Sequence, residues 1–217
     1  MALRNTSIQK QSVGVSLTST PKGLTVIRDP GCSAAIWHRE PIEEFQRWIN
    51  GLHPSELPSA RIMLHAEMVR DAMSDLFDVR RLPKCYERTL LIDDIAALSA
   101  IFSSIMASRY LRVRLEVIRT NACFRFHIDA VTARLICTYR GRSTQYGNSI
   151  MGSEPEEIHN VPVGSPIIMR GTLWRSGVKP DLLHRSPQIE GTGESRLVLI
   201  LDPIDDIEAN EFNGHLH

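Results

Sequence analysis

A change in the spacing of apolar residues near position 111 constrains the fold of this chain more than any other feature. Residues 111–117 read LRVRLEV, an alternation of apolar and charged side chains that is typical of a strand with one buried face. Short strands without intervening helices favour an antiparallel sandwich or barrel over alternating β-α-β units. Further strands, bounded by Gly, Pro, Ser and Asn, are predicted at residues 123–129, 133–139, 166–169, around 183, and 196–201.

The N-terminal half has a largely helical pattern, although a short strand closed by a turn is predicted at residues 23–31. Pro41 suits the first position of a helix with apolar side chains at three- and four-residue spacing, and a second helix is predicted after Pro58. A third is predicted from about Asp93, whose carboxylate suits a helix start. We therefore expect one α+β domain with helices outside a β-sandwich. Residues 1–109 would be mostly helical with short strands, 110–202 the strand-rich core, and 203–217 a tail.

Composition excludes several classes of protein. Lys and Arg number 25, as do Asp and Glu, so no general field points to nucleic acid or an anionic membrane. The cysteines form no Cys-x-x-Cys pair, and the first residues contain no apolar secretory segment. No apolar run reaches the roughly 18 residues of a transmembrane helix. We expect a soluble, cytoplasmic protein with reduced thiols and no membrane partner.

His127 and Asp129 occupy a predicted strand and lie two residues apart, so their side chains should share one face. His184 lies far downstream, beyond predicted strands that give the chain room to cross the sandwich and return to this pair. Two histidines and one carboxylate facing one cavity are diagnostic of non-haem Fe(II) oxygenases. We refer to His127, Asp129 and His184 as the triad.

Arg196 begins the most apolar strand of the chain and should share a face with Val198 and Ile200. If this face lines the cavity, the guanidinium is buried among aliphatic side chains, which is costly unless an anion meets it. A carboxylate of a bound co-substrate would be a suitable partner, because a guanidinium can bind it through two parallel hydrogen bonds. The alternative is an edge arginine whose stem packs while its head reaches water.

The triad and Arg196 stand in the order and rough spacing of the Fe(II)/2-oxoglutarate-dependent dioxygenases, which the chain resembles from about Tyr110 to Asp202. Residues 133–139 resemble the strand after the metal-binding pair of that family, and residues 161–169 resemble the segment before its distal histidine. The resemblance implies an antiparallel double-stranded β-helix, or cupin-like jelly roll, braced by N-terminal helices. It is also compatible with a bacterial family without an established activity.

By this resemblance, the triad would hold Fe(II), and Arg196 would bind the far carboxylate of 2-oxoglutarate. Tyr139 or Thr138 would add a hydrogen bond to the same carboxylate. The implied enzyme decarboxylates 2-oxoglutarate to succinate and hydroxylates or demethylates a substrate, either a small molecule or a protein. The metal carries the chemistry, and the protein orients the reactants and excludes side reactions.

Several residues around the predicted site have two interpretations. Arg125 either contacts substrate or forms a surface salt bridge, and Trp174 either walls the pocket or serves only in packing. Cys123 is either a small buried hydrophobe or a fourth ligand, which would favour zinc. A cupin-like zinc protein without oxygenase activity is therefore the alternative function, and an oligomerising β-sandwich with a degenerate site is a third. The acidic residues 202–208 are expected to be a solvated tail.

Overall fold

The structure is a computed structural model that describes residues 13–149, 153–175 and 181–204. Its N-terminal half combines strands with helices, in the order β1 (Val15–Thr18), the 3-10 helix η1 (Pro21–Arg28), β2 (Ala34–Trp37), α1 (Glu43–Gly51), β3 (Ala60–His65), the 3-10 helix η2 (Ala66–Met68), α2 (Val69–Val79) and α3 (Tyr86–Met106). The remaining described chain contains strands β4 (Tyr110–Ile118), β5 (Ala133–Arg140), β6 (Gln145–Asn148), β7 (His159–Asn160), β8 (Ile167–Arg170), β9 (Leu182–Arg185) and β10 (Arg196–Ile204).

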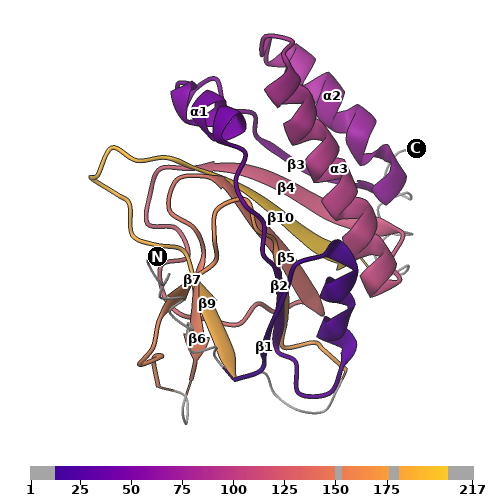
Figure 1. Ribbon diagram of the computed structural model, residues 1–217, viewed down its shortest axis with the longest axis vertical. Coiled ribbons are helices and arrows are strands. Elements are labelled where there is room, and N and C mark those ends of the chain that lie inside the picture. Colours follow the sequence, from indigo (N-terminus) through magenta and orange to yellow (C-terminus); the bar gives the residue numbers. More distant parts are fainter. Residues whose placement is uncertain (1–12, 150–152, 176–180, 205–217) are drawn as a thin grey trace, which may run out of the picture.

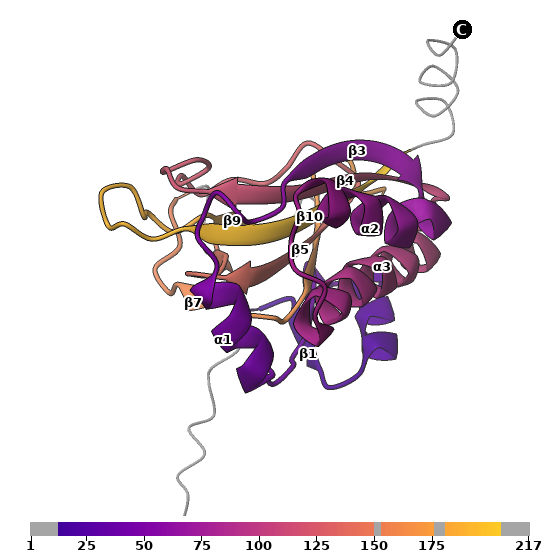
Figure 2. The same cartoon turned by 90° about the horizontal axis from the view of Figure 1, so that it is seen from above.

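The strands form two sheets. The large sheet has seven strands in the order β1-β2-β8-β5-β10-β4-β3, and the small sheet has three in the order β7-β6-β9. Neighbouring strands are antiparallel, except that β1 and β2 run parallel. Figure 1 shows the helices on one side of the large sheet and β6, β7 and β9 on the other, and Figure 2 shows the same layers from above. This α+β arrangement fits the expected jelly roll.

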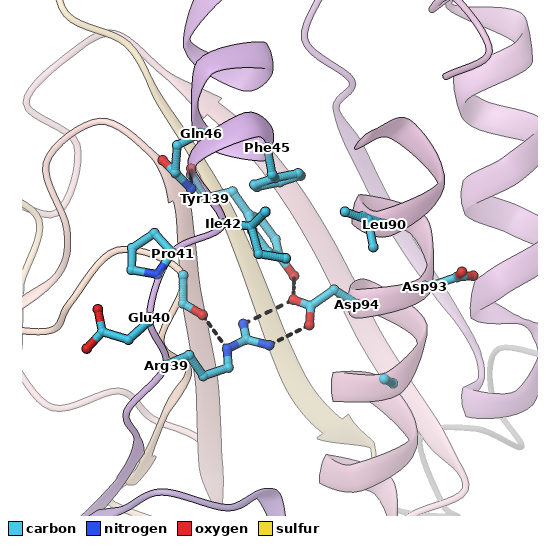
Figure 3. A pocket seen from close by; sticks show the side chains of 12 residues that line it. Arg39, Glu40, Pro41, Ile42, Phe45, Gln46, Leu90, Asp93, Asp94 and Tyr139 are labelled. Carbon is cyan, nitrogen blue, oxygen red and sulfur yellow. Dashed lines mark hydrogen bonds and ion pairs between the residues drawn. The ribbon is translucent and has the colours of Figure 1, made fainter. Parts of the chain in front are cut away.

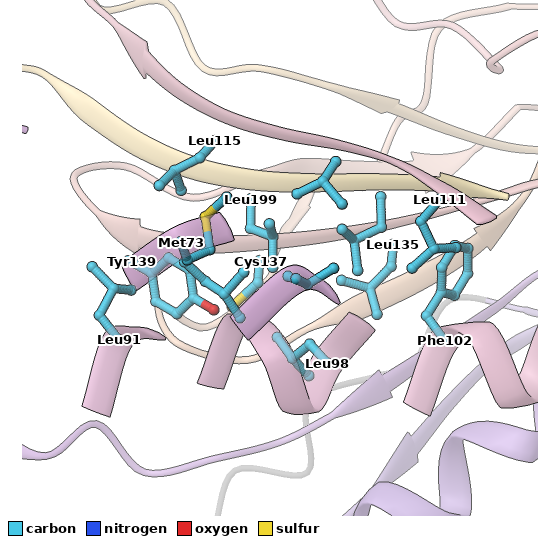
Figure 4. Close-up of a cluster of buried hydrophobic side chains, with 14 of the residues drawn as sticks. Met73, Leu91, Leu98, Phe102, Leu111, Leu115, Leu135, Cys137, Tyr139 and Leu199 are labelled. Atoms are coloured by element: carbon cyan, nitrogen blue, oxygen red, sulfur yellow. The ribbon is translucent and has the colours of Figure 1, made fainter. Parts of the chain in front are cut away.

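The helix-facing side of the large sheet is covered by an apolar core. Alternate residues of β4 point to it, and Leu111, Val113 and Leu115 are fully buried, as the LRVRLEV pattern predicts. Side chains from α3, including Leu98 and Phe102, pack against this face (Figure 4). Burying large apolar side chains of this kind contributes roughly 1.5–3 kcal/mol each.

A second apolar cluster fills the space between the two sheets. Ile136 on β5 and Val198 on β10 point inward from the large sheet, whereas Tyr146 on β6 and Leu182 on β9 point inward from the small one. β5 and β10 are therefore buried on both faces. The inward face of β10 also carries Arg196 into this interior.

The N-terminal half differs from the sequence-based expectation in several places. Helix α3 begins at Tyr86 rather than near Asp93, and strands β1 and β2 were not predicted. Residues 23–31 were expected to be a strand, but most of them belong to η1, which has Pro21 at its start. Residues 60–65 were expected to be helical, but they form β3 at the edge of the large sheet. The reason is tertiary: β3 pairs with β4 over its whole length, and this pairing outweighs local propensity.

The predicted strand at residues 123–129 is also wrong, because this segment is irregular apart from one bridge at His127. The other strands are found close to their predicted positions. The predicted tail begins later than expected, since β10 continues to Ile204 and residues 205–217 lie outside the described chain.

Helix α3 is long and apolar enough, by length and composition, to cross a membrane. No apolar segment of this length was expected from the sequence. Its apolar side chains, among them Leu91, Ile95, Leu98 and Phe102, are instead buried in the core against the large sheet. The same composition is expected of a core helix, so this helix is weak evidence for a membrane span.

Replacing Phe102 by Ala should reduce the free energy of unfolding by about 3–5 kcal/mol, because the fully buried ring leaves a cavity between α3 and the sheet. Denaturant unfolding followed by circular dichroism would measure it. Ile101→Ala on the same helix is the control, since Ile101 is only partly buried and should cost less. Equal effects of the two substitutions would contradict this account of the core.

Candidate metal centre

Two backbone hydrogen bonds bring His127 and His184 together. The amide of His127 donates to the carbonyl of His184, and the amide of His184 donates to the carbonyl of His127, both at 3.0 Å. This antiparallel bridge adds the irregular segment before Asp129 to the edge of β9. Residues paired in this way place their side chains on the same face, and the two imidazole centroids lie 4.5 Å apart.

Asp129 is positioned by the connection that follows β8. Its carbonyl accepts a hydrogen bond from the amide of Thr172 at 2.9 Å, and the carbonyl of Val131 accepts one from Leu173 at 3.1 Å. Gly171 packs so closely here that an added Cβ would lie 1.9 Å from the carbonyl oxygen of Val131 and 2.8 Å from that of Asp129. Glycine at position 171 thus permits the close backbone contact that fixes the third member of the triad.

The three side chains converge on one point. Their ligand atoms all lie within 4.8 Å of one another. Nε2 of His184 is 3.1 Å from Oδ2 of Asp129, and Nε2 of His127 is 3.6 Å from Oδ1 of Asp129. Neighbouring ligands that are each ~2.1 Å from one metal ion lie about 3 Å apart, so only small side-chain adjustments are needed.

The hydrogen bonds around the triad leave the right atoms free for a metal. Nδ1 of His127 lies 2.8 Å from the carbonyl of Arg125, which directs Nε2 toward the centre of the cluster. Oδ2 of Asp129 is buried and accepts no hydrogen bond from the residues that the structure describes. A buried carboxylate oxygen without a hydrogen-bond partner is costly, and a cation would satisfy it. The donor set therefore fits a divalent metal.

The protonation states of Asp129 and His184 suit binding of a metal ion. Burial alone would raise the pKa of Asp129, but the nearby nitrogens of His127 and His184 and the charge of Arg134 hold it well below its usual range. Burial lowers the pKa of His184, so its imidazole is favoured in the neutral form that binds metals. The carboxylate of Asp129, 3.6 Å from Nε2 of His127, raises the pKa of His127, so a metal ion would compete with a proton at this nitrogen.

Arg196 lines the same cavity as His127 and His184, which has a volume of about 80 Å³. It is only 1% exposed, and burial lowers its pKa to about 10. Its Nε donates to the carbonyl of Arg142 at 2.6 Å, and its Nη1 donates to Oγ of Ser186 at 2.8 Å. Within the part of the chain that the structure describes, no carboxylate pairs with it. The solvated-edge alternative is therefore wrong.

The prediction for Tyr139 is wrong, because its side chain points to the helix-facing side of β5. Its hydroxyl donates to Oδ2 of Asp94 at 2.7 Å, next to the ion pair of Asp94 with Arg39 (Figure 3). Thr138 is buried and pairs with Val198, but it does not border the cavity with the triad. Adjacent side chains of a strand point to opposite faces, so at most one of Thr138 and Tyr139 could have bound the carboxylate of 2-oxoglutarate.

The two predicted substrate contacts lie outside the cavity. Trp174 packs against the helix-side core with the guanidinium of Arg170 at 4.6 Å from its ring centroid, in agreement with its packing interpretation. Arg125 is exposed, and its guanidinium lies over the ring of Phe124. Cys123 borders the cavity, but it is exposed rather than buried and does not belong to the ligand cluster.

A larger cavity of about 350 Å³ lies on the helix side, between α1, α3 and β5 (Figure 3). Its walls are mostly apolar, and three of its polar residues, Arg39, Asp94 and Tyr139, already form hydrogen bonds with one another. It contains no member of the triad. The potential metal ligands His127 and His184 line the smaller cavity instead.

The sequence analysis missed two residues of the inner site. Arg134, on the inward face of β5, donates a hydrogen bond to Oδ1 of Asp129. Asp202 was assigned to a solvated tail, but it is 1% exposed and pairs with Arg134 and Arg114. Both residues are charged and lie at inward positions of otherwise apolar strands. This pattern could have indicated the pair, because buried charges need partners of opposite charge.

Comparison with known proteins gives a family and a fold. The profile of a family described as "Protein of unknown function (DUF1826)" matches residues 18–202. No curated protein matches the sequence. Dioxygenase for auxin oxidation 1 from Arabidopsis thaliana, solved with 2-oxoglutarate, aligns over 89% of this chain and 94% of its own, with a TM-score of 0.54 and 8% identity. This alignment shows that the chain shares the fold of that dioxygenase.

Two further solved structures align less closely. The rice dioxygenase for auxin oxidation aligns over 88% of this chain and 83% of its own, with a TM-score of 0.48 and 12% identity. A Pseudomonas putida prolyl-4-hydroxylase aligns over 86% of this chain and 100% of its own, with a TM-score of 0.43 and 9% identity.

Replacing Gly171 by Ala should displace the backbone at Asp129 and weaken binding of a divalent metal, because the methyl group would collide with two carbonyl oxygens. Titration with Mn(II), followed by electron paramagnetic resonance of the free ion, would measure the change. Gly51→Ala is the control, since an added Cβ at Gly51 has nothing within 4 Å. Unchanged Mn(II) affinity in well-folded Gly171→Ala protein would show that this contact does not position the ligand.

Proposed function

The chain belongs to this DUF1826 family, and we propose that it is an Fe(II)/2-oxoglutarate-dependent oxygenase that hydroxylates or demethylates a substrate. The shared fold supports the proposal, and His127, His184 and Arg196 line one cavity between its two sheets. Fold alone does not define an activity. The proposal therefore depends on the side chains of the cavity.

The observation that carries the proposal is the buried Arg196 beside the triad. Its guanidinium has hydrogen bonds to a carbonyl and a hydroxyl, but no anion offsets its charge within the described residues. A simple structural role would leave the cost of burying this cation uncompensated. A dicarboxylate that reaches from the metal to Arg196 would supply the missing negative charge and two charge-assisted hydrogen bonds.

Each part of the site has a defined task in this reaction. His127, His184 and Asp129 would hold Fe(II) and leave positions open for the co-substrate and oxygen. The bound iron would supply oxidation of a substrate carbon by molecular oxygen, with one oxygen atom entering the substrate as a hydroxyl and the other entering the succinate that forms, with carbon dioxide, from 2-oxoglutarate. The aliphatic side chains of the cavity, among them Ile136, Val198 and Ile200, would exclude water from the reacting groups.

A zinc protein without oxygenase activity is less well supported. Thiolate ligands favour zinc, but Cys123 is not in the cluster formed by the triad. A zinc site would also give no reason for a buried arginine beside it. The acid-binding role of Arg196 is therefore the feature that separates the two functions.

Adding Fe(II) and then 2-oxoglutarate to the apoprotein without oxygen should produce the visible charge-transfer band of the iron chelate. Arg196→Ala should retain Fe(II) binding but weaken 2-oxoglutarate binding by about 10-fold or more, since a charge-assisted bond contributes ~1.5–3 kcal/mol. Arg142→Ala is the matched control, because it removes an exposed arginine but keeps the carbonyl that binds Arg196. Absence of the band in folded wild-type protein would refute the proposed function.

His127→Ala and His184→Ala should each abolish stoichiometric Fe(II) binding, because either substitution leaves only two ligands. Equilibrium dialysis with metal analysis by mass spectrometry would measure the bound iron. The exposed His53 provides the control, and His53→Ala should bind iron like the wild type. Full occupancy in both triad variants would show that the ligands are elsewhere.

A further inference from the structure

A continuous network of charges connects the metal centre to the large sheet. Arg134 donates from Nε to Oδ1 of Asp202 at 2.6 Å and from Nη2 to Oδ2 of the same carboxylate at 3.0 Å. Its remaining nitrogen, Nη1, donates to Oδ1 of Asp129. One guanidinium therefore joins a buried carboxylate of β10 to the carboxylate of the triad.

Asp202 holds Arg134 in a fixed orientation. The side chain of Asp202 is only 2% exposed, and its Oδ2 also accepts a hydrogen bond from Nη2 of Arg114 at 3.0 Å. Two cations thus compensate the buried Asp202, and the bidentate contact fixes the plane of the Arg134 guanidinium. Because this plane is fixed, Nη1 has a defined direction toward Asp129.

The contact from Arg134 makes the two oxygens of Asp129 unequal. Oδ1 accepts a hydrogen bond from Arg134, whereas Oδ2 is buried, accepts no hydrogen bond within the described part of the chain, and lies 3.1 Å from Nε2 of His184. A metal between the histidines would therefore meet Oδ2. A carboxylate that was free to rotate could instead present both oxygens to the metal and occupy an additional coordination position.

We infer that Arg134, fixed by Asp202, is a positioning residue that makes Asp129 a ligand through one oxygen and keeps a coordination position open for the co-substrate. This inference rests on the proposed function in requiring that the triad binds a metal. It goes further by assigning the geometry of the centre to a pair of residues outside the triad. Partners of this kind typically change metal affinity by about 10–100-fold when they are removed.

Arg114 provides a matched control. It binds the same oxygen of Asp202 and has a similarly low exposure, 14% against 16% for Arg134, but it makes no contact with Asp129. Loss of either arginine removes one positive charge from the same network. Only loss of Arg134 should release the carboxylate of the triad.

The experiment is a titration of full-length apoprotein with Co(II) alone, without 2-oxoglutarate, followed by its visible d–d spectrum. Arg134→Gln should bind Co(II) about 10–100-fold more weakly and show a changed spectrum, because Asp129 is released. Arg134→Lys keeps the charge but loses the two-pronged contact, so it should recover only part of the affinity. Arg114→Gln should retain the wild-type spectrum and bind Co(II) with an affinity within about twofold of the wild type, because Arg114 does not contact the carboxylate of Asp129.

The outcomes separate this inference from the proposed function. If wild-type protein does not bind Co(II), the proposed metal site itself is wrong, and the inference falls with it. If wild-type protein binds Co(II) but Arg134→Gln matches Arg114→Gln in affinity and spectrum, or binds more tightly than the wild type, the positioning role alone is refuted. Thermal unfolding of every variant checks the fold, and Arg134→Lys provides the test if Arg134→Gln does not fold.

Discussion

Neutralisation of buried charge on the inward face of the large sheet is the constraint on which the candidate site depends. Asp202 is compensated by two arginines, and one of these, Arg134, is shared with Asp129. Arg196 is different, because no acidic side chain of the described chain pairs with it. Apolar side chains at these positions could be buried without the desolvation free energy that charged side chains cost. Stability of the fold alone therefore does not explain the charged residues. We interpret these buried charges as a requirement of the proposed binding of a metal ion and an anion.

The strand-rich core could be predicted because it depends on a local pattern, whereas the triad was proposed from the type, order and spacing of its residues. The alternation in residues 111–117 is a direct consequence of strand geometry, and β4 follows it. The face of Arg196 was predicted from the same periodicity. His127 and Asp129 were paired for a partly incorrect reason, since their segment is irregular and only one bridge is formed. Their convergence comes from backbone contacts to His184 and Thr172 instead.

The remaining features depend on contacts between residues far apart in sequence. Asp202 lies in an acidic run that resembles a solvated tail, and only the register of β10 against β5 places it beside Arg134. Residues 60–65 become a strand because β4 offers an edge for pairing. Tyr139 is a plausible ligand of a carboxylate by residue type, but Asp94 on α3 binds its hydroxyl on the other face. Sequence periodicity predicts the face of a strand to which a side chain points, but it does not predict which residue the side chain contacts there.

The candidate metal centre consequently combines positions set by separate parts of the fold. The small sheet places His184, and through the backbone bridge it also places His127. The connection after β8 holds the backbone of Asp129, whereas the large sheet holds its carboxylate through Arg134. The two sheets pack through an apolar cluster that includes Ile136 and Val198, so this cluster sets the separation of the ligands. A misplacement of catalytic groups by about 1 Å can lower a reaction rate by ~100-fold. Packing between the two sheets should therefore affect the candidate site as strongly as the potential ligands do.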